Sequence, residues 1–125
     1  MASHNLLGTE GENAAAEFLI SKGLIIRERN WRFRHLEVDI IAESAGGCLH
    51  IVEVKTRATD VHFSPLQAIT KAKIMHLVSA ARVYMNYYQL KREVQFDVVT
   101  VVGNPGNFKI DYYPRCFYPP LRTYR

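Results

Sequence analysis

The stretch LEVDIIAESAGGCLHIVEVKTR, residues Leu36 to Arg57, decides the fold, because it predicts two β-strands joined by a short glycine turn. Apolar and β-branched residues dominate both halves, as expected of buried strands. Glu37 and Asp39 nevertheless stand before the turn, and Glu53 and Lys55 stand after it. Charged side chains in the middle of a sheet need either solvent or compensating partners.

The sequence around this hairpin predicts a single α/β domain. Helices are expected at residues 8–23 and 64–88, and further strands at residues 24–33, 94–103 and 108–113. The order is α-β-β-β-α-β-β, which gives a mixed sheet of about five strands flanked by helices. A strand, a long helix and a second strand form a right-handed crossover, so the strands before and after the second helix should be parallel. The domain covers residues 1–125, with an irregular C-terminal tail from about residue 114.

Both expected helices carry capping signals at their first turns. Thr9 and Glu12 have the spacing of a capping box in the first helix. In the second helix, Ser64 is the expected N-cap, Pro65 takes the first helical position, and Gln67 completes another capping box. The apolar stripe of this second helix is expected to contain Leu66, Ile69, Leu77, Val78, Ala81, Tyr84 and Tyr88.

Composition narrows the class of protein. The chain has 125 residues, of which 48% are hydrophobic, and no apolar run approaches the roughly 20 residues that span a bilayer. Neither a signal peptide nor a glycine-rich phosphate loop is predicted, so we expect no membrane and no nucleotide cofactor. The only cysteines, Cys48 and Cys116, show no disulfide or zinc pattern, which favours a cytoplasmic protein. The net charge of +4 is a mild indication that the protein binds a polyanion.

The length of the turn decides whether the charged residues meet. If Ala45 to Gly47 form a three-residue loop, Ile41 pairs with Ile51 and Asp39 lies opposite Glu53. Glu37 then lies opposite Lys55. A two-residue loop would instead send Asp39 to the other face of the sheet. The three-residue loop is favoured, because it pairs apolar residues with one another.

Two interpretations of the opposed carboxylates remain open. Like charges that face each other across two strands are destabilising, and a hard divalent cation such as Mg²⁺ or Mn²⁺ would compensate Asp39 and Glu53. Lys55 is placed to stabilise developing negative charge. Two carboxylates, a divalent cation and a lysine are groups suited to the hydrolysis of a phosphodiester. Alternatively, Glu37 and Lys55 form an ordinary cross-strand ion pair, while Asp39 and Glu53 are solvated on an open sheet face.

Basic residues elsewhere are candidates for phosphate contacts. Arginines alternate with Trp31 and Phe33 in the first strand, at positions Arg27, Arg29, Arg32 and Arg34. They either bind phosphates or protect an edge strand from pairing. Because they fall on both faces, only some are expected to reach a nucleic acid, and Arg32 and Arg34 are selected. Arg57 at the end of its strand and Lys71 in the second helix complete the candidate set.

The spacing of the acidic residues resembles a known motif. EVD, then thirteen residues, then EVK is similar to the PD-(D/E)xK nuclease motif, with Asp39, Glu53 and Lys55 at its three positions and Val38 where the proline would stand. The longer stretch GTEGENAAAEFLISKGLIIRERNWRFRHLEVDIIAESAGGCLHIVEVKTR, residues 8–57, resembles the YraN-like family of uncharacterised bacterial proteins. That family is similar to archaeal Holliday junction resolvases, and the resemblance extends to about Val102.

This resemblance implies a restriction-endonuclease-like fold and a metal-dependent endonuclease that hydrolyses DNA phosphodiesters, including branched or junction structures. It implies a homodimer as the working unit. Asp39 and Glu53 would be metal ligands for Mg²⁺ or Mn²⁺, Lys55 the catalytic lysine, and Glu12 an additional catalytic acid from the first helix. The alternative is a non-catalytic nucleic-acid-binding module with a nuclease-like fold. RNA in place of DNA is not excluded by the sequence.

Overall fold

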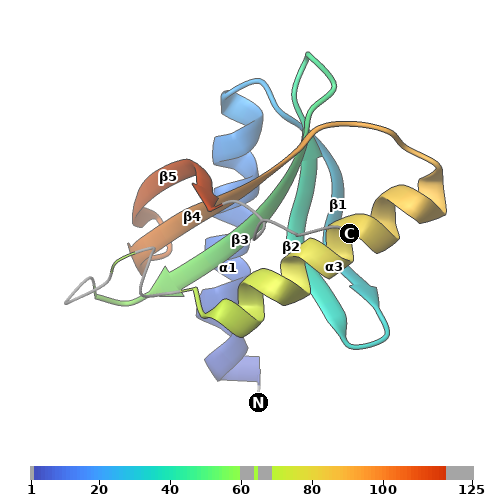
Figure 1. Cartoon of the computed structure of the whole chain (residues 1–125). Helices are drawn as coiled ribbons and strands as arrows, with labels where there is room; N and C mark the ends of the chain where they lie inside the picture. Colours follow the sequence, from blue (N-terminus) through green and yellow to red (C-terminus); the bar gives the residue numbers. More distant parts are fainter. Residues whose placement is uncertain (1, 60–63, 65–68, 118–125) are drawn as a thin grey trace.

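The computed structural model describes residues 2–59, 64 and 69–117, and side chains from residue 6 onward. Two helices and five strands are found among the described residues, in the predicted order α-β-β-β-α-β-β (Figure 1). They are α1 (Ala2–Ser21), β1 (Ile25–Phe33), β2 (Leu36–Glu43), β3 (Leu49–Arg57), α3 (Lys71–Tyr88), β4 (Val94–Asn104) and β5 (Asn107–Phe117). None of these helices is both long and apolar enough to cross a membrane.

The five strands form one mixed sheet in the spatial order β1-β2-β3-β4-β5. Strands β3 and β4 are parallel, as the crossover through the second helix predicted, and the other neighbours are antiparallel. The α/β architecture is therefore confirmed, and it is consistent with a restriction-endonuclease-like fold. Strand β5 continues through Pro114 to Phe117, past the expected start of the irregular tail. Residues 118–125 lie outside the described part of the chain.

The two helices cover opposite faces of the sheet (Figure 1). On one face, Leu77 and Tyr84 of α3 pack against Ile41 and Ile51 in one buried cluster. On the other face, Leu19 of α1 packs in a second cluster that contains Ile40 and Val52. The alternation of side chains along β2 and β3 thus produces two separate cores, because each strand is apolar on both faces.

Both helices begin at different residues from those predicted. Helix α1 already begins at Ala2, so Thr9 lies inside it and the predicted capping box with Glu12 is wrong. Helix α3 begins at Lys71, and its N-cap is Thr70, whose hydroxyl oxygen accepts a hydrogen bond of 3.1 Å from the Lys73 amide. The prediction that this helix starts at Ser64 is therefore wrong. Pro65, Leu66 and Gln67 lie outside the described residues.

The central hairpin has the predicted register. Ile41 pairs with Ile51, and the Ser44 amide bonds the Cys48 carbonyl at 3.0 Å, which leaves Ala45 to Gly47 as the loop. The paired positions of β2 and β3 end at Ile40 and Val52, next to the charged residues. Position 39 is also missing from the pairing of β1 with β2, which passes from Ile40 to Val38. Asp39 therefore lies just past the last β2–β3 pair, while the β1–β2 register is the same on both sides of it.

Candidate functional site

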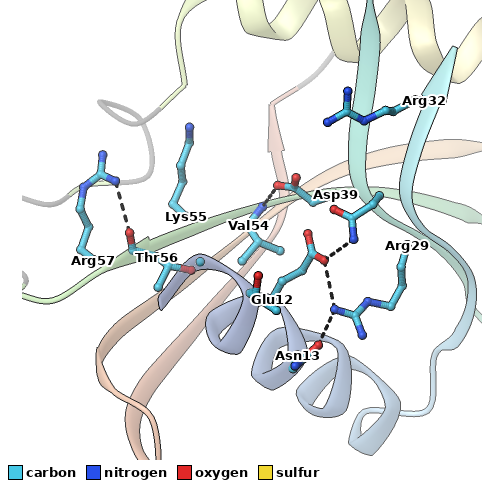
Figure 2. A pocket seen from close by; sticks show the side chains of 12 residues that line it. Glu12, Asn13, Arg29, Arg32, Asp39, Val54, Lys55, Thr56 and Arg57 are labelled. Atoms are coloured by element: carbon cyan, nitrogen blue, oxygen red, sulfur yellow. Dashed lines mark hydrogen bonds and ion pairs between the residues drawn. The ribbon is translucent and has the colours of Figure 1, made fainter. Parts of the chain in front are cut away.

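A cleft of about 880 Å³ opens where β2 and β3 stop pairing. Helix α1 and strands β1, β2 and β3 all contribute to its lining, which includes Glu12, Arg29, Asp39, Lys55 and Arg57. Figure 2 shows Glu12 reaching from α1 toward the carboxylate of Asp39, while Lys55 and Arg57 extend from β3 away from α1. The cleft thus combines groups from both faces of the sheet.

Asp39 occupies the gap between the two strands. Its Oδ2 atom accepts a hydrogen bond of 2.8 Å from the backbone amide of Val54, so a side chain replaces the partner that a neighbouring strand would supply. Burial and, next, the nearby charge of Glu53 together raise the pKa of Asp39 from 3.8 to about 7, against the opposing effect of the Val54 hydrogen bond. Asp39 and Glu53 are therefore close enough to interact, and ionising both at once is unfavourable.

Glu53 is a buried carboxylate with two different oxygen environments. The residue is only 4% exposed, although it lies in the middle of a charged group. Its Oε2 atom is 3.2 Å from Nζ of Lys55 and 3.8 Å from Nζ of Lys73. Its Oε1 atom is buried and has no hydrogen-bond partner among the described residues. A buried oxygen without a partner is unusual, and it marks a position where a ligand is expected.

Glu12 approaches the gap from the opposite side. Its Oε1 atom is 3.0 Å from Nη2 of Arg29 and accepts a hydrogen bond of 2.8 Å from the side-chain amide of Asn30. Its negative charge contributes to the raised pKa of Asp39. Glu12 is thus held by contacts with β1 and does not cap its helix.

Gly11 allows α1 to come close to β3 beside this carboxylate. A Cβ atom added at Gly11 would lie 2.2 Å from Oγ1 and 2.6 Å from Cγ2 of Thr56. Both distances are shorter than van der Waals contact, so any side chain at this position would displace the helix or Thr56. The absence of a side chain at Gly11 therefore sets how deeply Glu12 reaches into the cleft.

The donor set fits a hard divalent cation. Carboxylate oxygens are the ligands that Mg²⁺ prefers, and such sites are commonly completed by water and by substrate phosphates. Asp39 and Glu53 offer two carboxylates, and the unpartnered Oε1 atom of Glu53 is free to bind. No cluster of at least three His, Cys, Asp or Glu side chains among the described residues is arranged to hold a metal. A cation here would therefore rest on this pair of residues and on ligands from outside the protein.

Lys73 is a member of the site that sequence reasoning missed. It stands in the first turn of α3, where the sequence analysis selected Lys71. Lys71 is exposed and forms no ion pair within the described part of the chain, whereas Lys73 reaches Glu53. No local pattern distinguishes the two lysines. The difference follows from where α3 begins and how it packs on β3.

The arginines of β1 have different surroundings. Arg32 forms an exposed ion pair of 3.1 Å with Glu37. Lys55 pairs with Glu53, so the alternative interpretation, an ion pair between Glu37 and Lys55, is not found between these two described residues. Arg34 lies in the turn after β1, with a positive φ of 57° and its guanidinium 5.4 Å from the ring of Phe33. Both side chains are exposed, and Arg32 also lines the cleft.

Arg27 is directed away from the cleft. Its guanidinium bonds the hydroxyl of Tyr84 at 2.8 Å and the carboxylate of Glu43 at 3.0 Å. The arginines of β1 therefore do not all share one environment. Arg57 lies at the exposed end of β3 and lines the cleft, as its place directly after the acidic motif predicted.

A second buried polar cluster lies away from the cleft. In that cluster the Nδ1 atom of His50 is 2.8 Å from Oδ2 of Asp97. Asp97 also accepts hydrogen bonds from Tyr112, from Gln95 and from the backbone amide of Arg115. Burial acts to raise the pKa of Asp97, but these hydrogen bonds outweigh it and lower the pKa. This cluster holds the last part of β5 against β4.

Fold and site together define an α/β protein with a carboxylate–lysine cleft at the point where two strands of a mixed sheet separate. The model of the uncharacterised protein family UPF0102 matches residues 11–101, and the chain belongs to this family, as the YraN-like resemblance predicted. It is similar to a UPF0102 protein of Bacteroides thetaiotaomicron, with 48% identity over 97% of this chain and 99% of the relative. A UPF0102 protein of Flavobacterium psychrophilum is 42% identical over 94% of this chain and 98% of the relative.

Proposed function

We propose that this protein is a metal-dependent endonuclease of the PD-(D/E)xK superfamily that hydrolyses DNA phosphodiesters. One observation carries the proposal. Glu53 is buried next to Asp39 and Lys55, and its Oε1 atom has no hydrogen-bond partner in the described structure. Leaving this oxygen without a ligand is unfavourable, because a buried polar atom without a hydrogen-bond partner is destabilising.

Each residue of the cleft has a role in this reaction. Asp39 and Glu53 would hold Mg²⁺ or Mn²⁺, and such an ion supplies Lewis acidity toward the phosphate and lowers the pKa of a bound water. The Lys55 ammonium group stabilises the negative charge that develops on the phosphate. Glu12, already held by Arg29 and Asn30, orients water from the α1 side. The phosphate backbone would be contacted by four exposed basic residues, Arg32 and Arg57 in the cleft lining and Arg34 and Lys71 elsewhere on the surface.

The proposed partner is DNA, including branched or junction structures, with a homodimer as the working unit. The overall charge of +4 favours a polyanion without distinguishing DNA from RNA. Two copies of the cleft would act on two strands of a branched substrate, as the resemblance to junction resolvases implies. The cleavage experiment below includes RNA and unbranched substrates, so it also decides the substrate class.

A non-catalytic nucleic-acid-binding module is the second candidate, and one observation favours it. Cations of the protein already neutralise both acids that flank Asp39. Arg29 is paired with Glu12, and Lys55 is paired with Glu53. A site neutralised in this way can persist without a metal ion, and its arginines and lysines can still bind phosphates.

Cleavage assays with matched variants separate the two functions. The purified protein is incubated with duplex DNA, single-stranded DNA, a four-way junction and RNA, each with Mg²⁺, Mn²⁺ or EDTA. The endonuclease should cleave at least one DNA substrate only with metal, and Glu53→Gln should abolish cleavage while DNA binding is retained. Glu37→Gln removes an exposed carboxylate of the same hairpin and should cleave like the wild type.

Two outcomes contradict the nuclease. Binding without cleavage under every metal condition supports the binding module. Metal-dependent cleavage that survives undiminished in Glu53→Gln identifies a contaminating nuclease, because the variant lacks a proposed ligand.

A further inference from the structure

Lys73 is a second lysine near Glu53. It comes from α3, and it reaches a carboxylate that already has a lysine partner. Lys55 lies 3.2 Å from Oε2 of Glu53, within hydrogen-bond distance, whereas Lys73 lies 3.8 Å from the same atom. Glu53 therefore has one close and one longer cationic contact.

The charges of the cleft are distributed unevenly. Two ammonium groups converge on Oε2 of Glu53, while Oε1 has no partner and Asp39 forms no ion pair among the described residues. The charge of Lys73 also acts on Asp39, since it opposes the rise in the pKa of that residue. Lys73 is thus a cation from outside the central hairpin that acts on both carboxylates.

The side chain of Lys73 is able to leave this position. It is 33% exposed, more than the 24% of Lys55 and far more than the 5% of Glu53. Its backbone is fixed by the Thr70 cap, so only the flexible side chain has to move. Moving a partly exposed ammonium into water costs little, because lysine is strongly hydrated.

We propose that Lys73 is an internal counter-ion of Glu53 that a divalent cation must displace, so that this lysine sets how tightly the Asp39–Glu53 site binds metal. The inference rests on the proposed metal site. A positive charge next to a cation site opposes the binding of a second cation. Without metal, Lys73 offsets the repulsion between the two carboxylates. With metal, the displaced ammonium group becomes available to a phosphate of the nucleic acid.

Calorimetric titration with Mn²⁺, in the absence of nucleic acid, tests this role without an activity readout. Lys73→Gln removes the charge and retains a polar chain, and it should bind Mn²⁺ about tenfold more tightly than the wild type. Lys73→Arg keeps the charge and should bind Mn²⁺ with the affinity of the wild type. Arg82→Gln removes one positive charge from an exposed position of the same helix and should leave the affinity unchanged.

The possible failures are distinguishable. If Glu53→Gln abolishes Mn²⁺ binding but Lys73→Gln binds no more tightly than the wild type, the counter-ion role is refuted and the metal site stands. If neither the wild type nor Lys73→Gln shows Mn²⁺ binding that depends on Glu53, the metal site and the counter-ion role are both refuted. Thermal unfolding of each variant verifies that it is folded.

Discussion

The carboxylate of Asp39 accepts a hydrogen bond of 2.8 Å from the backbone amide of Val54, in the gap where β2 and β3 have stopped pairing. A side chain therefore satisfies an amide that a neighbouring strand leaves unpaired. The same contact fixes the carboxylate beside Glu53, where burial and the charge of Glu53 disfavour the ionised form of Asp39. Asp39 thus both supports the backbone of β3 and supplies a carboxylate to the candidate site.

The first prediction concerns pH. The pKa of Asp39 in the folded protein is about 7, against 3.8 as its ordinary value, so the folded state holds more protons than the unfolded state between these values. The free energy of unfolding should therefore fall as pH rises through this range. Asp39→Asn lacks this titration and keeps an oxygen for Val54. Between pH 5 and pH 8 it should gain about 2–3 kcal/mol relative to the wild type, since one pKa unit is about 1.4 kcal/mol.

Urea unfolding at several pH values measures this difference. Glu37→Gln, which neutralises an exposed carboxylate of the same strand, serves as the control and should not show the gain. If the free energy of unfolding differs between Asp39→Asn and the wild type by the same amount at every pH from 5 to 8, the raised pKa of Asp39 is contradicted. Mg²⁺ should reduce the loss of stability at high pH in the wild type, because a bound cation favours the ionised carboxylate.

The second prediction concerns Arg57, at the exposed end of β3. Arg57→Ala should weaken DNA binding and lower the slope of log affinity against log salt by about one, because one phosphate contact is lost. Fluorescence anisotropy at a series of salt concentrations measures the slope. Arg82→Ala, an exposed arginine of α3, is the control. Equal slopes for the wild type and Arg57→Ala would show that Arg57 does not contact phosphate.

The third prediction concerns the contact between α1 and β3. Gly11→Ala places a methyl group where Oγ1 of Thr56 would be 2.2 Å away, so the helix or Thr56 must shift. We expect a loss of about 1–3 kcal/mol in the free energy of unfolding, as is common for overpacking. Gly8→Ala is the matched control, because nothing lies within 4 Å of the added atom. The double change Gly11→Ala/Thr56→Ser should recover part of the loss, since it removes the Cγ2 methyl group.

The fourth prediction concerns Asp97. Asp97→Ala leaves the hydrogen-bonding groups of His50, Gln95, Tyr112 and the Arg115 amide without their acceptor. A loss of about 3 kcal/mol or more is expected, because unsatisfied buried groups are costly. Asp111→Ala, on β5, is the control. Chemical unfolding that gives similar losses for both variants would contradict the structural role of the cluster.

The sequence predicts the fold well wherever a short local rule determines it. The three-residue glycine loop between β2 and β3 correctly predicted that Ile41 pairs with Ile51. The crossover through the second helix correctly predicted that β3 and β4 are parallel. Both rules depend on chain geometry alone, and no tertiary contact can change them easily.

The helix starts were mispredicted for a physical reason. The spacing of Thr9 and Glu12 is that of a capping box, but it is also the spacing of neighbours on the surface of any helix. The preceding residues decide between the two, and α1 simply continues back to Ala2. At α3, Thr70 caps the helix with a hydroxyl group that the sequence analysis passed over in favour of Ser64.

The composition of the site was only partly predictable. The spacing of Asp39, Glu53 and Lys55 could be derived from strand alternation and register. The ion pair of Arg32 with Glu37 depends on how β1 pairs with β2, and the approach of Lys73 depends on how α3 packs on the sheet. Such contacts between elements that are distant in sequence are set by tertiary packing, which local patterns do not describe.

The interruption of pairing at Asp39 has a kinetic consequence. A ligand that enters between β2 and β3 need not break a strand–strand hydrogen bond, because their paired positions already end at Ile40 and Val52. The rate of association is then set by diffusion and by the attraction between charges, with no slow opening step ahead of it. The association rate constant should therefore fall smoothly as the salt concentration rises. At each salt concentration, the observed association rate should increase linearly with protein concentration.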